Sequence, residues 1–312
     1  MSDPINDPAD FHRNGQSARP AEPAEVAAEP TAQLLRLGDL LGDFRRDADA
    51  AHLARTTGQP RGPVSGLAVL DRELGGALAP GLHGIHGNAG AGKTAFALQV
   101  AASCGCPALF VSCEMAPLEL LRRQTARATR TYLGRLKSGE LRGEDAEKLA
   151  RRAIEAAPLL AFIDATRGPA TPKYLLDCAR IVRGQARHLL IVVDSLHSWA
   201  QGISEGLPEY EALNAGLQDL QRLAAGLACP VVVVSERNRA SMAGGGLSAG
   251  AGTRKIEYSA ETIIELDRKN DAKEDGAGEV EVTLKLAKNR HGVADKPVAL
   301  KFDGALQSFR LA

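Results

Sequence analysis

Eight consecutive residues in the first third of the chain have the types and the spacing needed to hold a polyphosphate. They match the pattern G-x-x-x-x-G-K-[ST] at each fixed position, and they are Gly87, Asn88, Ala89, Gly90, Ala91, Gly92, Lys93 and Thr94. Glycines let the backbone curl so that successive N–H groups point at one anion. Lys93 can reach the β- and γ-phosphates, and the Thr94 hydroxyl can ligate Mg²⁺. We therefore predict a site for a nucleoside triphosphate and Mg²⁺.

The residues on either side form the elements that such a loop needs. Residues 82–86 read as a short strand before the loop, and residues 95–102 read as a helix after it. The N-terminal end of this helix would face the phosphates with free N–H groups and a partial positive charge. An ordinary flexible glycine loop is the alternative, and the match at every fixed position disfavours it.

Two carboxylates follow apolar strands and could serve the same site. The apolar run 189–193 ends in Asp194, and an aspartate so placed in a phosphate-loop protein holds Mg²⁺ through water or Thr94. Glu114 ends another strand, where it could polarise the water that attacks the γ-phosphate. Its alternative role is to favour a helix N-terminus through the helix dipole. Sequence spacing alone does not separate these two roles.

From residue 63 onward strands and helices alternate, which is typical of a parallel sheet with crossover helices. The candidate buried strands are the apolar runs 108–111, 159–163, 189–193 and 231–234. Helical periodicity covers 118–131, 144–156, 174–185 and 210–227. Four more strands follow without helices between them, at 262–266, 280–286, 298–302 and 306–309. We therefore predict an α/β fold with a mainly parallel central sheet and an antiparallel C-terminal extension.

The composition divides the chain into three parts. Residues 1–30 are rich in Ala, Pro, Glu and Asp, which predicts a disordered tail. Residues 31–62 contain an apolar stripe of helical spacing, followed by a turn rich in Gly and Pro. The stripe consists of Leu34, Leu37, Leu41, Phe44, Ala48 and Ala51. It could pack on its own domain, residues 63–312, or dock on a neighbouring subunit.

Composition also excludes several classes of protein. Lys and Arg (38) balance Asp and Glu (38), so a nucleic acid would have to be held by a local cationic patch. The five cysteines include no C-x-x-C pair, which excludes a zinc ribbon. We see no signal-peptide pattern and no apolar run long enough to cross a bilayer. We therefore expect a cytoplasmic protein without membrane contact.

Six segments together resemble the RecA-like ATPase domain of DnaB-type replicative helicases. The matching segments are 64–71 with 74–76, 112–115 with Arg122 and Arg123, Asp194, 235–239, 256–261 and 288–292. They occur in the family's order and spacing over residues 31–311, which makes the resemblance far more specific than any single motif.

This resemblance implies an ATP-hydrolysing ring, hexameric in this family, that moves along single-stranded DNA as a helicase or translocase. It implies that Glu114 activates water and that Asp194 holds Mg²⁺. Lys288 and Arg290 would reach the γ-phosphate bound by the adjacent subunit. Residues 31–62 would be the family's linker helix, docked on that subunit, and a replication accessory protein is a further expected partner.

The resemblance also places DNA contacts in two segments that we expect to be loops, 196–208 and 238–255. The second is rich in glycine, and its backbone N–H groups and flanking cations could bind phosphates. These cations are Arg237, Arg239, Arg254 and Lys255. Trp199 in the first segment could stack on a base, or it could simply pack in the core.

The sequence departs from the family pattern at a few places. Residues 1–30 do not resemble the helical domain that precedes the ATPase domain in the family. Glu236 replaces a glutamine thought to sense the bound phosphate, and Glu261 replaces an aspartate. Residues 288–292 also resemble a motif of RadA-type ATPases. A RadA- or KaiC-like ATPase in recombination or signalling therefore stays open, as does a nucleotide-gated scaffold or loader with slow hydrolysis.

Overall fold

The computed structural model describes residues 34–236, 251–268 and 278–312, and the predicted α/β fold is confirmed there. The helices are η1 (Leu37–Leu40), α1 (Leu41–Thr57), α2 (Ala68–Glu73), α3 (Lys93–Ser103), α4 (Pro117–Thr129), α5 (Gly143–Glu155), α6 (Pro172–Arg183), α7 (Leu196–Ile203), α8 (Glu209–Leu227) and α10 (Ala251–Ser259). The strands are β1 (Gly81–Gly87), β2 (Ala108–Ser112), β3 (Leu160–Asp164), β4 (Leu190–Asp194), β5 (Pro230–Glu236), β6 (Thr262–Arg268), β7 (Glu279–Asn289), β8 (Pro297–Asp303) and β9 (Ser308–Leu311).

The described strands form one sheet in the order β3-β2-β4-β5-β1-β6-β7-β8-β9. The pairs from β3 to β6 are parallel, and the pairs from β6 to β9 are antiparallel. Strands β4 and β5 lie near the middle and are apolar on both faces, as buried parallel strands are. The predicted antiparallel C-terminal extension is therefore confirmed.

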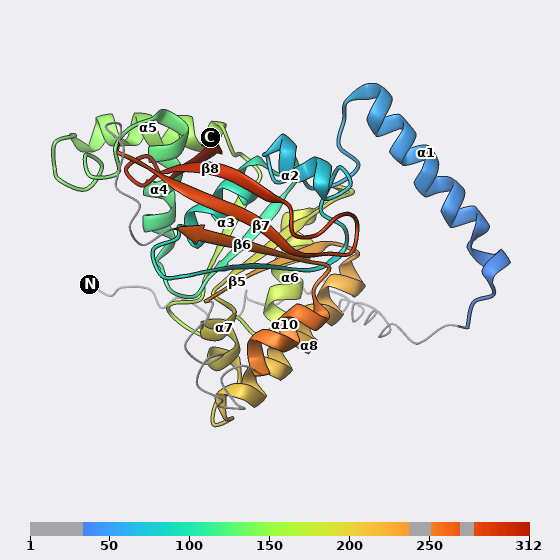
Figure 1. Ribbon diagram of the computed structural model, residues 1–312. Helices are drawn as coiled ribbons and strands as arrows, with labels where there is room; N and C mark the ends of the chain where they lie inside the picture. The colour runs from blue at the N-terminus through green and yellow to red at the C-terminus, as the bar shows by residue number, and fades with distance from the viewer. Residues whose placement is uncertain (1–33, 237–250, 269–277) are drawn as a thin grey trace, which may run out of the picture. The chain divides into compact units, whose positions relative to one another are not determined.

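Helices cover both faces of the parallel part of the sheet. One core cluster contains residues of α2, α3 and α4, and a second contains residues of α6, α7, α8 and α10. Figure 1 shows α3 and α4 on one side of the sheet and α7, α8 and α10 on the other. Because these helices lie on the faces of the sheet, side chains at the carboxyl ends of the parallel strands can meet a ligand.

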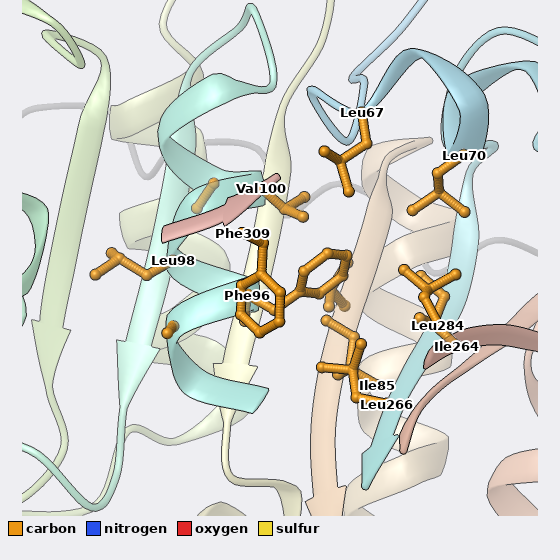
Figure 2. Packing of buried hydrophobic residues seen from close by; sticks show 14 of the residues in the cluster. Leu67, Leu70, Ile85, Phe96, Leu98, Val100, Ile264, Leu266, Leu284 and Phe309 are labelled. Carbon is orange, nitrogen blue, oxygen red and sulfur yellow. The ribbon is translucent and has the colours of Figure 1, made fainter. Parts of the chain in front are cut away.

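The antiparallel extension packs directly on α3. The Phe309 ring of β9 meets the Phe96 ring of α3 edge-on, with centroids 5.4 Å apart (Figure 2). The Gln99 side chain of α3 exchanges two hydrogen bonds with the Phe309 backbone, at 2.9 and 2.8 Å. The end of the chain therefore braces the helix that follows the phosphate-binding loop.

Two sequence-based expectations differ from the structure. The loop predicted over 196–208 is wrong for its first part, since residues 196–203 form α7, and the Ser195 side chain accepts a hydrogen bond at its N-terminus. In the other predicted loop, residues 251–255 belong to α10. The rest of that loop, 238–250, lies outside the described residues, as does the predicted disordered tail, 1–30.

Helix α1 contains no buried residue. It ends at Thr57 and is followed by Gly58, whose left-handed backbone (φ 71°) suits a helix C-cap. The predicted apolar stripe is exposed, with Leu37 91%, Leu41 70% and Phe44 72% accessible. Nothing in the described part of the chain covers this face. None of the described helices is long and apolar enough to cross a membrane.

Candidate nucleotide-binding site

The register of the parallel strands brings the predicted phosphate-binding residues to one edge of the sheet. Gly87 at the end of β1 pairs with Glu236 at the end of β5, and Asp194 at the end of β4 pairs with Ser112 of β2. A cavity of about 330 Å³ opens there. Its lining includes Ala89, Gly90, Gly92, Lys93, Thr94, Glu114, Arg123, Asp194, Ser195, Glu236 and Gln307.

The loop between β1 and α3 has the backbone that a phosphate cradle requires. Gly90 and Gly92 have φ angles of 76° and 85°, a region that glycine adopts readily and other residues rarely do. A Cβ added at Gly92 would lie 2.8 Å from Cζ of Phe309, so this position also has no room for a side chain. Lys93 is the first residue of α3, which places the N–H groups of the helix beside the loop.

The Lys93 ammonium lies inside the curve of the loop. Its Nζ donates to the carbonyl oxygens of Gly87 and Asn88, at 3.0 and 3.1 Å. It also lies 3.8 Å from Oε1 of Glu236. The residue that replaces the family's glutamine therefore lies close enough to compete with a phosphate for the lysine.

Asp194 is buried beside Thr94. Burial raises the pKa of Asp194 to about 6. A hydrogen bond with the Thr94 side chain opposes this rise in pKa, and so do the charges of Lys93 and Arg123, whereas the charge of Glu114 adds to it. A carboxylate and a hydroxyl are hard oxygen donors of the kind that Mg²⁺ prefers, so these residues fit the predicted ion.

Glu114 lies at the rim of the same cavity, on the turn between β2 and α4. Its Oε1 accepts hydrogen bonds from the hydroxyls of Ser195 and Ser198, the latter at 3.0 Å. Both predicted acidic residues, Asp194 and Glu114, thus meet at one cavity. Neither serine was singled out from the sequence, because their role depends on how β2 and β4 pair.

Two more residues of the cavity were not predicted as site residues. Arg123 of α4 donates to Oε1 of Gln307 at 2.6 Å, and both line the cavity. Arg123 lies in a matching motif, which was a usable signal. Gln307 lies in the turn between β8 and β9 with φ 54°, and no sequence pattern marked it.

Lys288 and Arg290 lie near the amino ends of the parallel strands, opposite to the ends that line the cavity. Because β7 runs antiparallel, Asn289 pairs with Thr262, which in turn pairs with His83, four residues before Gly87. Lys288 Nζ donates to the carbonyl oxygens of residues 257 and 258, at 2.6 and 3.1 Å. Burial, together with the charge of Arg290, lowers the pKa of Lys288.

Arg290 is held by the same end of the sheet. It donates to Oε1 of Glu261 at 3.2 Å and to the carbonyl of Tyr258 at 3.1 Å. The structure therefore does not bring Lys288 and Arg290 into the cavity of their own chain.

Trp199 belongs to the core rather than to a surface. It is 2% exposed, and its indole N–H donates to the carbonyl of Ala170 at 2.8 Å. Of the two interpretations of this residue, packing is the one that the structure supports, because no ring face is open to a base.

The comparisons with known proteins agree with this arrangement. The family model of the DnaB-like helicase C-terminal domain matches residues 62–311. A replicative DNA helicase DnaB from Treponema pallidum (strain Nichols) is 30% identical over 258 residues, which are 80% of this chain and 56% of that protein. The chain thus spans about half the length of this relative.

Solved structures show the same fold. One solved ATPase domain superposes with a TM-score of 0.71 and 19% identity, over 86% of this chain and 98% of that one. A DnaB-like replicative helicase, studied with its interactions with primase, superposes with a TM-score of 0.69 and 21% identity, over 89% and 67% of the two chains. The resemblance seen in the sequence is therefore confirmed, and the chain belongs to the family of DnaB-like helicase C-terminal domains.

Proposed function

We propose that this chain hydrolyses ATP and works as a ring-forming DnaB-like helicase or translocase on single-stranded DNA. The observation that carries the proposal is the convergence of the glycine loop, Lys93, Asp194 and Glu114 on one cavity at the carboxyl edge of the parallel strands. Ligands of open α/β sheets bind at this edge. We also propose a cytoplasmic location, which fits a protein that acts on DNA.

Each residue of the cavity has a distinct task in this proposal. Backbone N–H groups of the loop and the Lys93 ammonium bind the phosphates, which neutralises their charge before and during reaction. Thr94 and Asp194 would hold Mg²⁺, which supplies further charge neutralisation when bound. Glu114 takes a proton from the attacking water, since it has an acceptor oxygen at the rim of the cavity.

The remaining groups support action in a ring. Lys288 and Arg290 lie away from their own chain's cavity, so a role at a phosphate needs a second subunit. Residues 31–62 contain a helix with an exposed apolar stripe, which we propose docks on that subunit, while 63–312 form the motor and 1–30 a tail. DNA would contact the segments 196–208 and 238–255. A replication accessory protein is a further proposed partner.

A single experiment tests the proposal: ATP hydrolysis with and without single-stranded DNA, alongside a native mass measurement of the assembly. Lys93→Ala should abolish nucleotide binding, whereas Glu114→Gln should bind ATP normally and fail to turn it over. Glu147→Gln, on the exposed face of α5, is the matched control. Wild-type turnover by Glu114→Gln would refute the assignment of the water-activating residue, and a monomer at all concentrations would refute the ring.

One observation favours a second candidate function. The carboxylate of Glu236 lies 3.8 Å from the Lys93 ammonium, which disfavours a phosphate anion at the same place. A nucleotide-gated scaffold or loader with slow hydrolysis would tolerate this. It would assemble in the presence of ATP and stay assembled over many minutes without releasing phosphate, whereas a motor would show DNA-stimulated phosphate release on the same samples.

A further inference from the structure

A cluster of two hydroxyls and one carboxylate joins the candidate water-activating residue to α7. Ser195 and Ser198 both donate to the same oxygen, Oε1, of Glu114. Their own hydroxyl oxygens are 3.0 Å apart. In the described part of the chain, Oε2 of Glu114 takes no hydrogen bond from the protein, so it stays available to accept one from a water in the cavity.

We infer that Ser195 and Ser198 are positioning residues that hold the Glu114 carboxylate for reaction and connect it to the start of α7. The inference rests on the proposed function. Glu114 is exposed and follows the end of β2, so its side chain would otherwise sample several rotamers. Hydrogen bonds to a charged acceptor are among the stronger ones. Two such bonds to Oε1 fix the orientation of the carboxylate, and with it the direction in which Oε2 points.

Capping of α7 explains only part of this cluster. Ser195 Oγ accepts from the backbone N–H of Ser198, as an N-cap serine does. This cap needs no hydroxyl on residue 198. The contact between the Ser198 hydroxyl and Glu114 is therefore additional to the cap, and a variant at 198 can remove it while the cap remains.

Helix α7 connects the cluster to the rest of the segment 196–208, and side chains of the helix anchor it in the core. Leu196 and Trp199 are buried, and Trp199 is hydrogen-bonded to Ala170. Residues 196–208 are the first of the two segments proposed to contact DNA. A shift of this segment on DNA binding would move both serine hydroxyls together, and the Glu114 carboxylate with them. The hydroxyl pair thereby offers a route by which DNA raises the rate of hydrolysis.

The test compares Ser198→Ala, Ser198→Thr and the double variant Ser195→Ala/Ser198→Ala in the full chain. We expect kcat for ATP to fall about threefold to tenfold in Ser198→Ala and further in the double variant, while KM stays within about twofold. Ser198→Thr keeps the hydroxyl and should restore kcat. Stimulation by single-stranded DNA should shrink in both alanine variants.

A serine–glutamate pair elsewhere on the surface provides the control. Ser138 donates to Glu140 at 3.1 Å, away from the cavity, so Ser138→Ala should keep wild-type kinetics. Wild-type kcat and DNA stimulation in the double variant, with Glu114→Gln inactive, would overturn the positioning role alone. If Glu114→Gln itself keeps wild-type turnover, the proposed role of Glu114 is refuted, and the positioning role of the two serines is refuted with it.

Discussion

At the scale of residues, the environment of each carboxylate in the cavity suits it to a different task. Asp194 is buried beside Thr94 and has a pKa raised to about 6 by burial, so its charged form needs a cation. Glu114 is exposed and anchored through one oxygen only. The buried carboxylate therefore suits a metal ion, and the exposed one suits a solvent molecule that must enter and leave.

Replacing Glu236 by glutamine tests whether its charge competes with the phosphates. Its carboxylate is exposed and lies 3.8 Å from the Lys93 ammonium. We expect Glu236→Gln to bind ATP roughly threefold more tightly, since an exposed ion pair is weak. The measurement is titration with a fluorescent ATP analogue, and Glu281→Gln on β7 is the control. Weaker binding by Glu236→Gln would show that the carboxylate supports the site.

His83 should make the fold sensitive to mild acid. It is fully buried in β1, with Nε2 2.7 Å from the carbonyl of Ala79 and Nδ1 2.8 Å from the Thr262 hydroxyl. Burial lowers its pKa to about 4. The unfolded chain therefore binds a proton at higher pH than the folded one. The stabilisation due to neutral His83 is complete above about pH 6.5 and is lost between pH 6.5 and 4.

The measurement is urea unfolding of wild type and His83→Gln from pH 8 to pH 4. The difference between their free energies of unfolding should shrink by about 2–3 kcal/mol over this range. His52→Gln, on the exposed surface of α1, is the control. A constant gap for His83→Gln would mean that the imidazole is protonated as easily in the folded chain as in the unfolded one.

At the scale of elements, the antiparallel extension shapes the phosphate-binding loop. The Phe302 and Phe309 rings stack with centroids 4.4 Å apart, and Phe309 fills the space beside Gly92. Phe309→Ala should lower the free energy of unfolding by about 3–5 kcal/mol. It should also weaken ATP binding by the folded protein, because the loop loses its support.

The variant Phe162→Ala separates the loss of stability from the loss of ATP affinity. Phe162 packs against Phe110 at 5.9 Å in the edge strand β3, far from the loop along the sheet order. This variant should lose stability and keep the ATP affinity of the folded protein, measured by fluorescence titration at a temperature where both variants are folded. Equal loss of affinity in the two variants would contradict a specific role of the extension.

Sequence periodicity predicted the elements whose apolar pattern follows their burial. It failed for features that depend on contacts between segments distant in the sequence. The strands ending at Asp194 and Glu236 are continuous apolar runs, so their burial was predictable. Helix α7 was missed although its capping residue, Ser195, is a local signal. Its buried Trp199 is fixed by a hydrogen bond to residue 170, a contact between distant segments that periodicity does not reveal. Arg123 and Gln307 meet from α4 and a late turn, 184 residues apart, and local spacing carries no signal of that meeting.

At the scale of the whole molecule, the exposed face of α1 needs a partner. Leu41 and Phe44 are 70% and 72% accessible, and burial of such side chains contributes about 1.5–3 kcal/mol each. Leu41→Ala/Phe44→Ala should leave the melting temperature of the monomer unchanged, because the residues pack on nothing in the described part of their own chain. The same variant should shift the assembly to smaller mass and lower DNA-stimulated hydrolysis.

The control is Arg45→Ala, whose side chain is 85% exposed on the same helix. Removal of residues 1–30 alone should also have little effect on assembly, whereas removal of residues 1–57 should reproduce the double variant. An assembly of unchanged mass in the double variant would show that the stripe is not the docking face.

Complementation between two inactive variants tests whether Arg290 acts across a subunit boundary. Arg290→Ala keeps Glu114 in its own cavity but cannot supply Arg290 to its neighbour. Glu114→Gln can supply Arg290 to its neighbour but lacks the water-activating residue in its own cavity. Each should be nearly inactive alone. In a mixed ring, a site with Glu114 can receive Arg290 from the next subunit, so a one-to-one mixture should recover activity at about a quarter of the sites. Lys285→Ala, which removes an ion-paired cation of β7, the strand that Arg290 follows, should stay active alone. An inactive mixture whose subunits are shown by mass to exchange would place Arg290 in its own subunit's chemistry or outside the reaction altogether.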